Sequence, residues 1–188
     1  MMKLAVFCGS NLGRTDIYRH AAAELGNALV EQDIALVFGG TNKGLMKVLA
    51  DTVLQAGGSA HGIIPRTLAE RQQQYLGLTQ AEIVETRSLR KLRMAELADG
   101  FVALPGGIGT LEEVLEMWVD AQFEGHKKPI GLYNVAGFFD PLLAFVDRMV
   151  EEAFLPPQQK AMIIVNSDPR ALLSALRSFT PVTTPKWL

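Results

Sequence analysis

Residues 105–113 read Pro-Gly-Gly-Ile-Gly-Thr-Leu-Glu-Glu, a combination that could bind an anion and act on the molecule carrying it. The glycines allow positive φ angles and a close backbone approach to a ligand. An apolar run precedes the loop and an amphipathic run follows it. The loop therefore opens a helix whose free N–H groups and positive dipole end suit a phosphate. Glu112 and Glu113 add two carboxylates, which mere phosphate binding would not need, so chemistry on a phosphorylated substrate is the better explanation.

The same residues have a purely structural interpretation, because Thr110 to Glu113 also fits a helix capping box. In that arrangement Thr110 is the N-cap and Glu113 reaches back to its backbone N–H. The T-x-x-E pattern alone is common and favours plain capping, and Gly-Gly-x-Gly alone is a weak phosphate signal. Only the whole nonapeptide, placed after a strand, is specific enough to favour a functional site.

Short apolar runs alternate with helical patterns along the whole chain, which places this loop within an α/β protein. The apolar runs are continuous, as expected for strands covered on both faces. This order predicts a Rossmann-like, doubly wound parallel sheet flanked by helices, in a single domain over residues 1–188. The predicted strands are 4–8, 34–38, 60–64, 101–104, 130–133 and 162–165, and the predicted helices are 16–31, 44–55, 89–98, 111–123, 141–152 and 169–177. Residues 66–80 are expected to form a long irregular segment.

Two further glycine loops follow predicted strands and so belong at the same edge of the sheet. Gly9 and Ser10 follow the first strand, and Gly39 and Gly40 follow the second. Together with the nonapeptide they would offer backbone N–H groups, hydroxyls and little side-chain bulk, which suits a nucleotide or sugar phosphate. None of the loops is a Walker P-loop, and the first lacks G-x-G-x-x-G, so a dinucleotide cofactor is not expected.

A basic segment, residues 87–94, precedes the fourth predicted strand and could contribute to the site. On a helix Arg90 and Met94 share one face, whereas Lys91 lies about 100° around the axis. A solvated basic face is the simpler interpretation for Arg87 and Arg93, and it extends to Lys91. Spacing alone does not decide the role of Arg90.

The overall composition excludes several classes of function. A formal charge of −2 argues against a broad electrostatic grip on nucleic acid. No apolar run reaches membrane-spanning length, and the first residues are too short for a signal peptide. The single Cys8 excludes an internal disulfide framework and indicates a cytoplasmic protein, with Cys8 itself a small core residue. The three scattered histidines provide no metal-ligand spacing, so neither a metal nor an organic cofactor is expected.

Nearly the whole chain resembles the LOG family of cytokinin-activating phosphoribohydrolases, whose members are often labelled lysine decarboxylases. Residues 8–10, 39–46, 90–94, 105–113 and 128–134 carry the resemblance. It implies hydrolysis of the N-glycosidic bond of N6-modified adenosine 5′-monophosphates, or of AMP, by a homodimer with sites close to its interface. By this resemblance Arg90 and Glu113 are the catalytic pair. The implied substrate and phosphate contacts are Gly9, Ser10, Gly39, Gly40, Lys91, Met94, Gly106, Gly107, Ile108, Gly109, Thr110 and Glu112.

Several positions depart from the family pattern. Met-His is common where Arg87 and Ser88 stand, and a Thr-Trp pair is common where Val119 and Asp120 stand. The second loop reads Gly-Gly-Thr-Asn-Lys-Gly where a third consecutive glycine is usual. The Arg-Lys pair and the nonapeptide are intact, so the cleavage chemistry is expected to be retained, with a reshaped base pocket.

Two other functions are compatible with parts of the sequence. The related molybdenum-cofactor carriers show that this fold can bind a ligand without cleaving it. Retention of Arg90 and of both glutamates argues against such a carrier. Lysine decarboxylation requires a lysine that forms a Schiff base with pyridoxal phosphate. Lys91 is available for that role, but nothing in the sequence marks a pyridoxal site.

For the cleavage step, departure of the base creates an oxocarbenium-like ribose. Glu113 is expected to stay ionised, because a helix dipole favours an anion at its start, and to act as a base or as an electrostatic stabiliser. Arg90 would either clamp the phosphate or polarise the departing base. A homodimer is expected because large apolar side chains lie near the site, although core packing is the default for each: Met117, Trp118 and Phe123 on the helix, and Phe138 and Phe139 in a loop.

Overall fold

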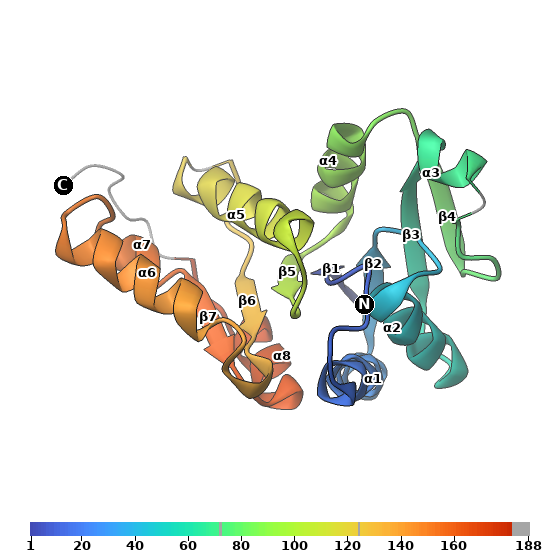
Figure 1. Ribbon diagram of the computed structural model, residues 1–188, viewed down its shortest axis with the longest axis horizontal. Helices are drawn as coiled ribbons and strands as arrows, with labels where there is room; N and C mark the ends of the chain where they lie inside the picture. The colour runs from blue at the N-terminus through green and yellow to red at the C-terminus, as the bar shows by residue number, and fades with distance from the viewer. Residues whose placement is uncertain (72, 124, 182–188) are drawn as a thin grey trace.

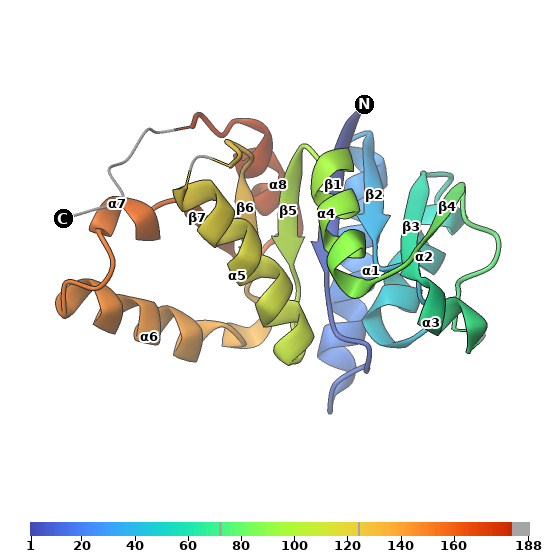
Figure 2. The same cartoon turned by 90° about the horizontal axis from the view of Figure 1, so that it is seen from above.

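The computed structural model describes residues 1–71, 73–123 and 125–181. At its centre lies a seven-stranded parallel sheet with the order β4-β3-β2-β1-β5-β6-β7 (Figures 1 and 2). The strands are β1 (Met2–Phe7), β2 (Ile34–Phe38), β3 (Ala60–Pro65), β4 (Gln80–Val84), β5 (Gly100–Ala103), β6 (Ile130–Tyr133) and β7 (Ile163–Asn166). From β1 the chain builds the sheet outward to β4 and then outward on the other side to β7. The predicted doubly wound parallel sheet is confirmed.

Helices cover both faces of the sheet. One face carries α1 (Asp16–Glu31), α2 (Gly44–Gln55) and α8 (Pro169–Arg177), and the other carries α4 (Arg87–Leu97) and α5 (Ile108–Gln122) (Figure 1). The remaining helices are α3 (Arg66–Glu70), η1 (Val135–Gly137), α6 (Asp140–Glu151) and α7 (Pro157–Lys160). None of the helices in the described ranges is long and apolar enough to cross a membrane.

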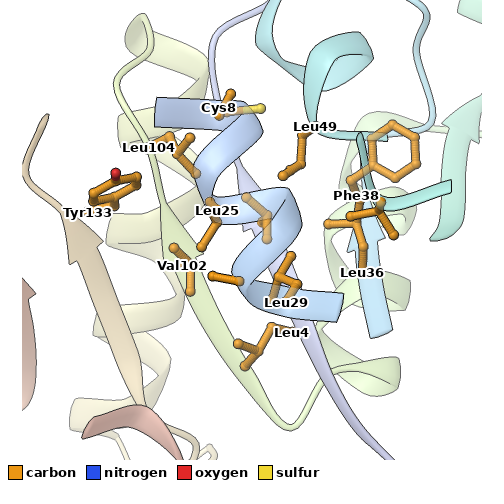
Figure 3. Packing of buried hydrophobic residues seen from close by; sticks show 14 of the residues in the cluster. Leu4, Cys8, Leu25, Leu29, Leu36, Phe38, Leu49, Val102, Leu104 and Tyr133 are labelled. Atoms are coloured by element: carbon orange, nitrogen blue, oxygen red, sulfur yellow. The ribbon is translucent and has the colours of Figure 1, made fainter. Parts of the chain in front are cut away.

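The apolar strands divide their side chains between two cores. In β1, Leu4 and Val6 belong to the cluster under α1, α2 and α8, whereas Ala5 and Phe7 belong to the cluster under α4 and α5. Figure 3 shows the first cluster, in which Leu25 and other residues of α1 pack on the sheet. Burial on both faces explains why these strands read as continuous apolar runs.

Two elements within and beside residues 66–80 were not predicted. The segment begins with the short helix α3, and its last residue, Gln80, begins the edge strand β4. Among the described residues, strand β4 pairs only with β3, and all five of its residues are exposed or half-buried. An edge strand with Glu82 and an exposed Ile83 lacks the continuous apolar run of the inner strands, so the pattern missed it. Residue 72 of this segment lies outside the described residues.

Three adjacent strands position the glycine loops, because β1 lies between β2 and β5. The loops contact one another directly through backbone hydrogen bonds. The N–H of Gly9 donates to the carbonyl of Pro105 at 3.1 Å, and the N–H of Leu45 donates to the carbonyl of Gly9 at 3.0 Å. The predicted convergence of the three loops at one edge of the sheet is therefore confirmed.

Candidate active site

A pocket of about 650 Å³ opens where these loops meet, a volume in the range of small-molecule sites. Its wall draws on β1, on the loops after β1 and β2, on α3 and the residues after it, on α4 and on the start of α5. The predicted site residues in this wall are Ser10, Gly39, Arg90, Met94, Gly107, Ile108, Gly109, Thr110 and Glu113. The predicted site residues outside it are Gly9, Gly40, Lys91, Gly106 and Glu112.

An ion pair between Arg90 of α4 and Glu113 of α5 lies in the pocket wall. The two residues are 8% and 9% exposed, and Nη2 of Arg90 donates to Oε1 of Glu113. Gly39 makes room for the guanidinium, since a Cβ at that position would lie 3.2 Å from Nη1. The buried Nε of Arg90 has no hydrogen-bond partner among the described residues. Buried donors are normally satisfied, so this N–H is an unmet hydrogen-bond donor in a residue of the pocket wall.

The carboxyl group of Glu113 binds its proton more tightly than an ordinary glutamate does. Burial raises its pKa, the charge of Arg90 opposes that rise, and Glu112 adds to it. The sequence predicted that the helix dipole would dominate, but Glu113 lies in the second turn of α5, beyond the first turn where the dipole acts. A pKa shifted toward neutral pH suits a general base.

The loop before α5 has the form of an anion-binding helix start. Gly107 is the N-cap, and no side chain caps the helix that begins at Ile108. The first backbone N–H groups that donate a hydrogen bond within the helix are those of Thr110 and Leu111. Both donate to the carbonyl of Gly107, Thr110 at 3.0 Å. The N–H groups of the residues before Thr110 are therefore free to meet a ligand. The capping-box interpretation is wrong, because Thr110 lies inside the first turn and Glu113 pairs with Arg90.

Lys91 and Glu112 belong to a separate cluster outside the pocket wall. The ammonium group of Lys91 contacts the Glu112 carboxylate and lies 2.6 Å from Oε2 of Glu116. The side chain of Lys91 is largely buried between the two helices, so these ion pairs join α4 to α5. The structure therefore brings neither Lys91 nor Glu112 to the substrate pocket.

The remaining predicted glycines, Gly9, Gly40 and Gly106, lie outside the pocket wall and shape the loops that form it. Gly9 and Gly106 line a smaller cavity of about 170 Å³, on which Ser10 and Gly107 also border. A Cβ on Gly106 would lie 2.9 Å from the N of Gly9, so glycine permits the close contact of these two loops. Gly40 has a φ of 67° and packs against β3, where it turns the chain away from β2.

The pocket wall also contains residues that the sequence did not predict for the site, among them Lys43, Thr67, Leu68, Arg71, Gln73 and Arg87. The residues after α3 contact the loop that follows β2, because the N–H of Asn42 donates to the carbonyl of Gln73 at 2.9 Å. The length of the irregular segment is a signal that could have pointed to a binding role. Arg87, which the sequence assigned to a solvated face, is exposed but lines the pocket.

Cys8 also borders the pocket, as a buried thiol at the end of β1. Burial, and to a smaller extent the charge of Glu113, raise the pKa of this thiol far above its usual range. A thiol that stays protonated is a poor nucleophile, so Cys8 is a core residue as predicted. Across the described parts of the chain, no three His, Cys, Asp or Glu residues are grouped closely enough to hold a metal ion.

The fold and the position of the pocket define a Rossmann-like α/β protein with its ligand site at the carboxyl ends of the central strands. A family model described as "Possible lysine decarboxylase" matches residues 46–176. Cytokinin riboside 5′-monophosphate phosphoribohydrolases LOG7 of Arabidopsis thaliana and LOG of Oryza sativa subsp. japonica are 41% and 42% identical to the chain. They match over 95% of this chain and over 82% and 74% of their own lengths. The chain belongs to this family, the LOG family.

Among solved structures, the molybdenum cofactor binding protein of the phototrophic bacterium Rippkaea orientalis has a TM-score of 0.72 to this chain at 20% sequence identity. The comparison covers 94% of this chain and 96% of that protein. At this level of identity the similarity shows a shared fold and carries no statement about the ligand.

Proposed function

We propose that this protein hydrolyses the N-glycosidic bond of adenosine 5′-monophosphates, with or without an N6 substituent, and releases the free base and ribose 5-phosphate. Water is the second reactant. Its oxygen bonds to C1′ as the bond from C1′ to the base nitrogen breaks, and the proton that the water loses ends on the released base. The names of the LOG relatives support this reaction and this class of substrate.

The observation that carries the proposal is the buried Arg90–Glu113 pair in one pocket with the start of α5. The free N–H groups at 107–109 bind the 5′-phosphate, and Glu113 faces the anomeric carbon. There its carboxylate stabilises the oxocarbenium-like ribose and takes a proton from the attacking water. Arg90 holds Glu113 through Nη2 and offers Nε to the substrate. A guanidinium is a poor proton donor, so Arg90 acts through charge and hydrogen bonding.

Incubation of the purified protein with AMP tests the function. We expect adenine and ribose 5-phosphate to appear in equal amounts, and adenosine to react far more slowly because it lacks the anion that the helix start binds. Chromatography of the free base measures both rates. Recovery of bound but intact AMP, with all N6-modified nucleotides equally stable, would instead favour a non-catalytic carrier.

Lysine decarboxylation, which the name of the family model suggests, does not fit the lysines of the site. Schiff-base formation needs an uncharged amine. Lys91 lies outside the pocket wall, and its pKa is raised because Glu112 and Glu116 outweigh the lowering effect of burial. Lys43 borders the pocket but is exposed. Neither lysine is placed as a pyridoxal phosphate enzyme requires.

We propose further that the protein is a homodimer that pairs through α4 and α5. Ile108, Leu115, Val119 and Phe123 are exposed at spacings that form one stripe along α5. Leu89 and Leu92 are exposed on α4, which the Lys91 ion pairs join to α5. An apolar stripe across two adjacent helices is typical of a protein interface. The residues first considered for the interface, Met117 and Trp118, are buried in the core instead.

Substitution of one residue in this stripe tests the dimer. Val119→Glu would bury a carboxylate in each half of the apolar interface, so we expect dissociation to increase at least about a hundredfold. Light scattering at micromolar concentration should give the dimer mass for wild type and the monomer mass for the variant. Phe154→Glu changes a residue that is 86% exposed just beyond α6 and should remain dimeric. A monomeric wild type, or a dimeric Val119→Glu, would contradict this interface.

We also propose a cytoplasmic location. The single Cys8 is buried and unpaired, and a chain without disulfides suits a reducing compartment. Fractionation of cells that produce the protein, with antibody detection, should recover it beside cytoplasmic markers. Recovery with secreted or membrane markers would contradict the proposal.

A further inference from the structure

Arg87 brings a cation to the helix start where the phosphate is expected to bind. It is the first residue of α4, and it lines the pocket together with Gly107, Ile108, Gly109 and Thr110. A Cβ built on Gly109 would lie 3.9 Å from Nη2 of Arg87. The guanidinium of one helix therefore lies beside the first turn of the other.

No carboxylate of the described residues contacts the guanidinium of Arg87. In the part of the chain that the structure describes, its guanidinium has no ion pair and no hydrogen bond. By contrast, Arg93 on the same helix lies 2.8 Å from Glu82. Glu113, the one acidic residue in the described pocket wall, is already paired with Arg90. The positive charge of Arg87 therefore acts on Glu113 only from a distance, where it helps to lower the pKa of that carboxyl group, and its guanidinium remains free to contact a ligand.

An arginine without a contacting carboxylate is unfavourable beside a helix start, because the guanidinium and the positive end of the dipole repel each other. A phosphate dianion removes this conflict, since it accepts hydrogen bonds from the guanidinium and from the backbone N–H groups at once. Lys43 and Arg71 border the same pocket and add to the potential that attracts a dianion. The arrangement is thus complementary to a phosphorylated ligand.

We propose that Arg87 is a specificity-determining residue that clamps the 5′-phosphate against the start of α5 and makes the protein select nucleotides over nucleosides. The inference rests on the proposed function and assigns part of phosphate recognition to α4. Arginine suits this position because its planar fork can donate two hydrogen bonds to one phosphate, which lysine cannot do in the same geometry.

Comparison of Arg87→Gln with Arg66→Gln tests the role. Both variants remove one exposed arginine from the first position of a helix, but Arg66 does not line the pocket. For Arg87→Gln we expect the KM for AMP and the inhibition constant of inorganic phosphate to rise about tenfold to a hundredfold, the usual effect of losing charge-assisted hydrogen bonds. We expect kcat to stay within about threefold of wild type and adenosine cleavage to be unchanged. Arg87→Lys should restore part of the affinity, and Arg66→Gln should behave as wild type.

An unchanged KM and an unchanged phosphate inhibition constant in Arg87→Gln would overturn the inference. An equal loss for AMP and adenosine would overturn it as well, because the effect would then not concern the phosphate. If the wild type cleaved no nucleotide, the proposed function would fail while the inference could still be decided. Calorimetry with AMP would then support it through a matching loss of affinity in Arg87→Gln, or overturn it through equal affinities.

Discussion

Replacement of Glu113 by glutamine is expected to remove almost all turnover while AMP still binds. Glutamine has the same shape, and its carbonyl can still accept the hydrogen bond from Arg90. The amide can neither take a proton from water nor stabilise positive charge on the ribose. We expect kcat to fall by about 10²- to 10⁴-fold and the Kd for AMP to stay within about threefold. Single-turnover release of adenine measures the first quantity, and calorimetry measures the second.

The pH profile of the wild type should report the same carboxylate. Burial raises the pKa of Glu113 above the ordinary value of 4.5, so kcat/KM should fall as the pH drops through that raised value. Glu116→Gln is the matched control, because this exposed carboxylate of α5 pairs with Lys91 outside the pocket. The Glu116→Gln control should keep the kcat of wild type and the same fall of kcat/KM at acid pH. Undiminished adenine release by Glu113→Gln would refute the assignment of Glu113.

Replacement of Arg90 by methionine is expected to damage both stability and activity. The variant leaves the carboxylate of Glu113 buried without its cation, and breaking a buried ion pair in this way typically costs about 3–5 kcal/mol. Arg93→Met is the matched control on α4, since its partners Glu82 and Glu96 are partly exposed and such pairs contribute about 0–1 kcal/mol. Denaturant unfolding at pH 7 measures both free energies. A loss for Arg90→Met as small as that of the control would contradict a buried pair.

The pH dependence of the Arg90→Met variant gives a second measurement. Without Arg90 the folded-state pKa of Glu113 rises further, because Arg90 is the main influence that lowers it. At pH values between the pKa of Glu113 in the unfolded chain and its higher pKa in the folded variant, the folded state binds one more proton than the unfolded state. The free energy of unfolding therefore falls as the pH rises through this window. The free energy of unfolding should therefore approach that of wild type at acid pH. Adding Glu113→Gln should recover part of the loss at pH 7, because it removes the unpaired charge.

The sheet could be predicted because its inner strands are buried on both faces. Strands such as β2 read as uninterrupted apolar runs, and all five of its residues are buried. The helix predicted over 169–177 begins at Pro169 as expected, because proline suits the first helical position, and Asp168 caps it by accepting a hydrogen bond from the N–H of Ala171 at 2.7 Å. Edge strand β4 escaped prediction because it has one neighbour and little apolar burial.

The site was only partly predictable, because its parts meet through tertiary structure. The position of the loops follows from the parallel sheet, since loops after neighbouring strands share one edge. The pairing of Arg90 with Glu113 joins two helices, and spacing within either helix does not reveal it. Lys91 adjoins Arg90 in the chain but turns to a different cluster, as the rotation along a helix allows. The contribution of Arg87 also depends on how α4 and α5 pack.

A crystal structure of the Glu113→Gln variant with AMP would test the geometry of the reaction most directly. The phosphate should lie on the free N–H groups at 107–109, and C1′ of the ribose should lie within reach of the side chain at position 113 through a single water molecule. A ribose bound away from position 113, or a phosphate bound away from the start of α5, would show that these residues do not carry the cleavage step.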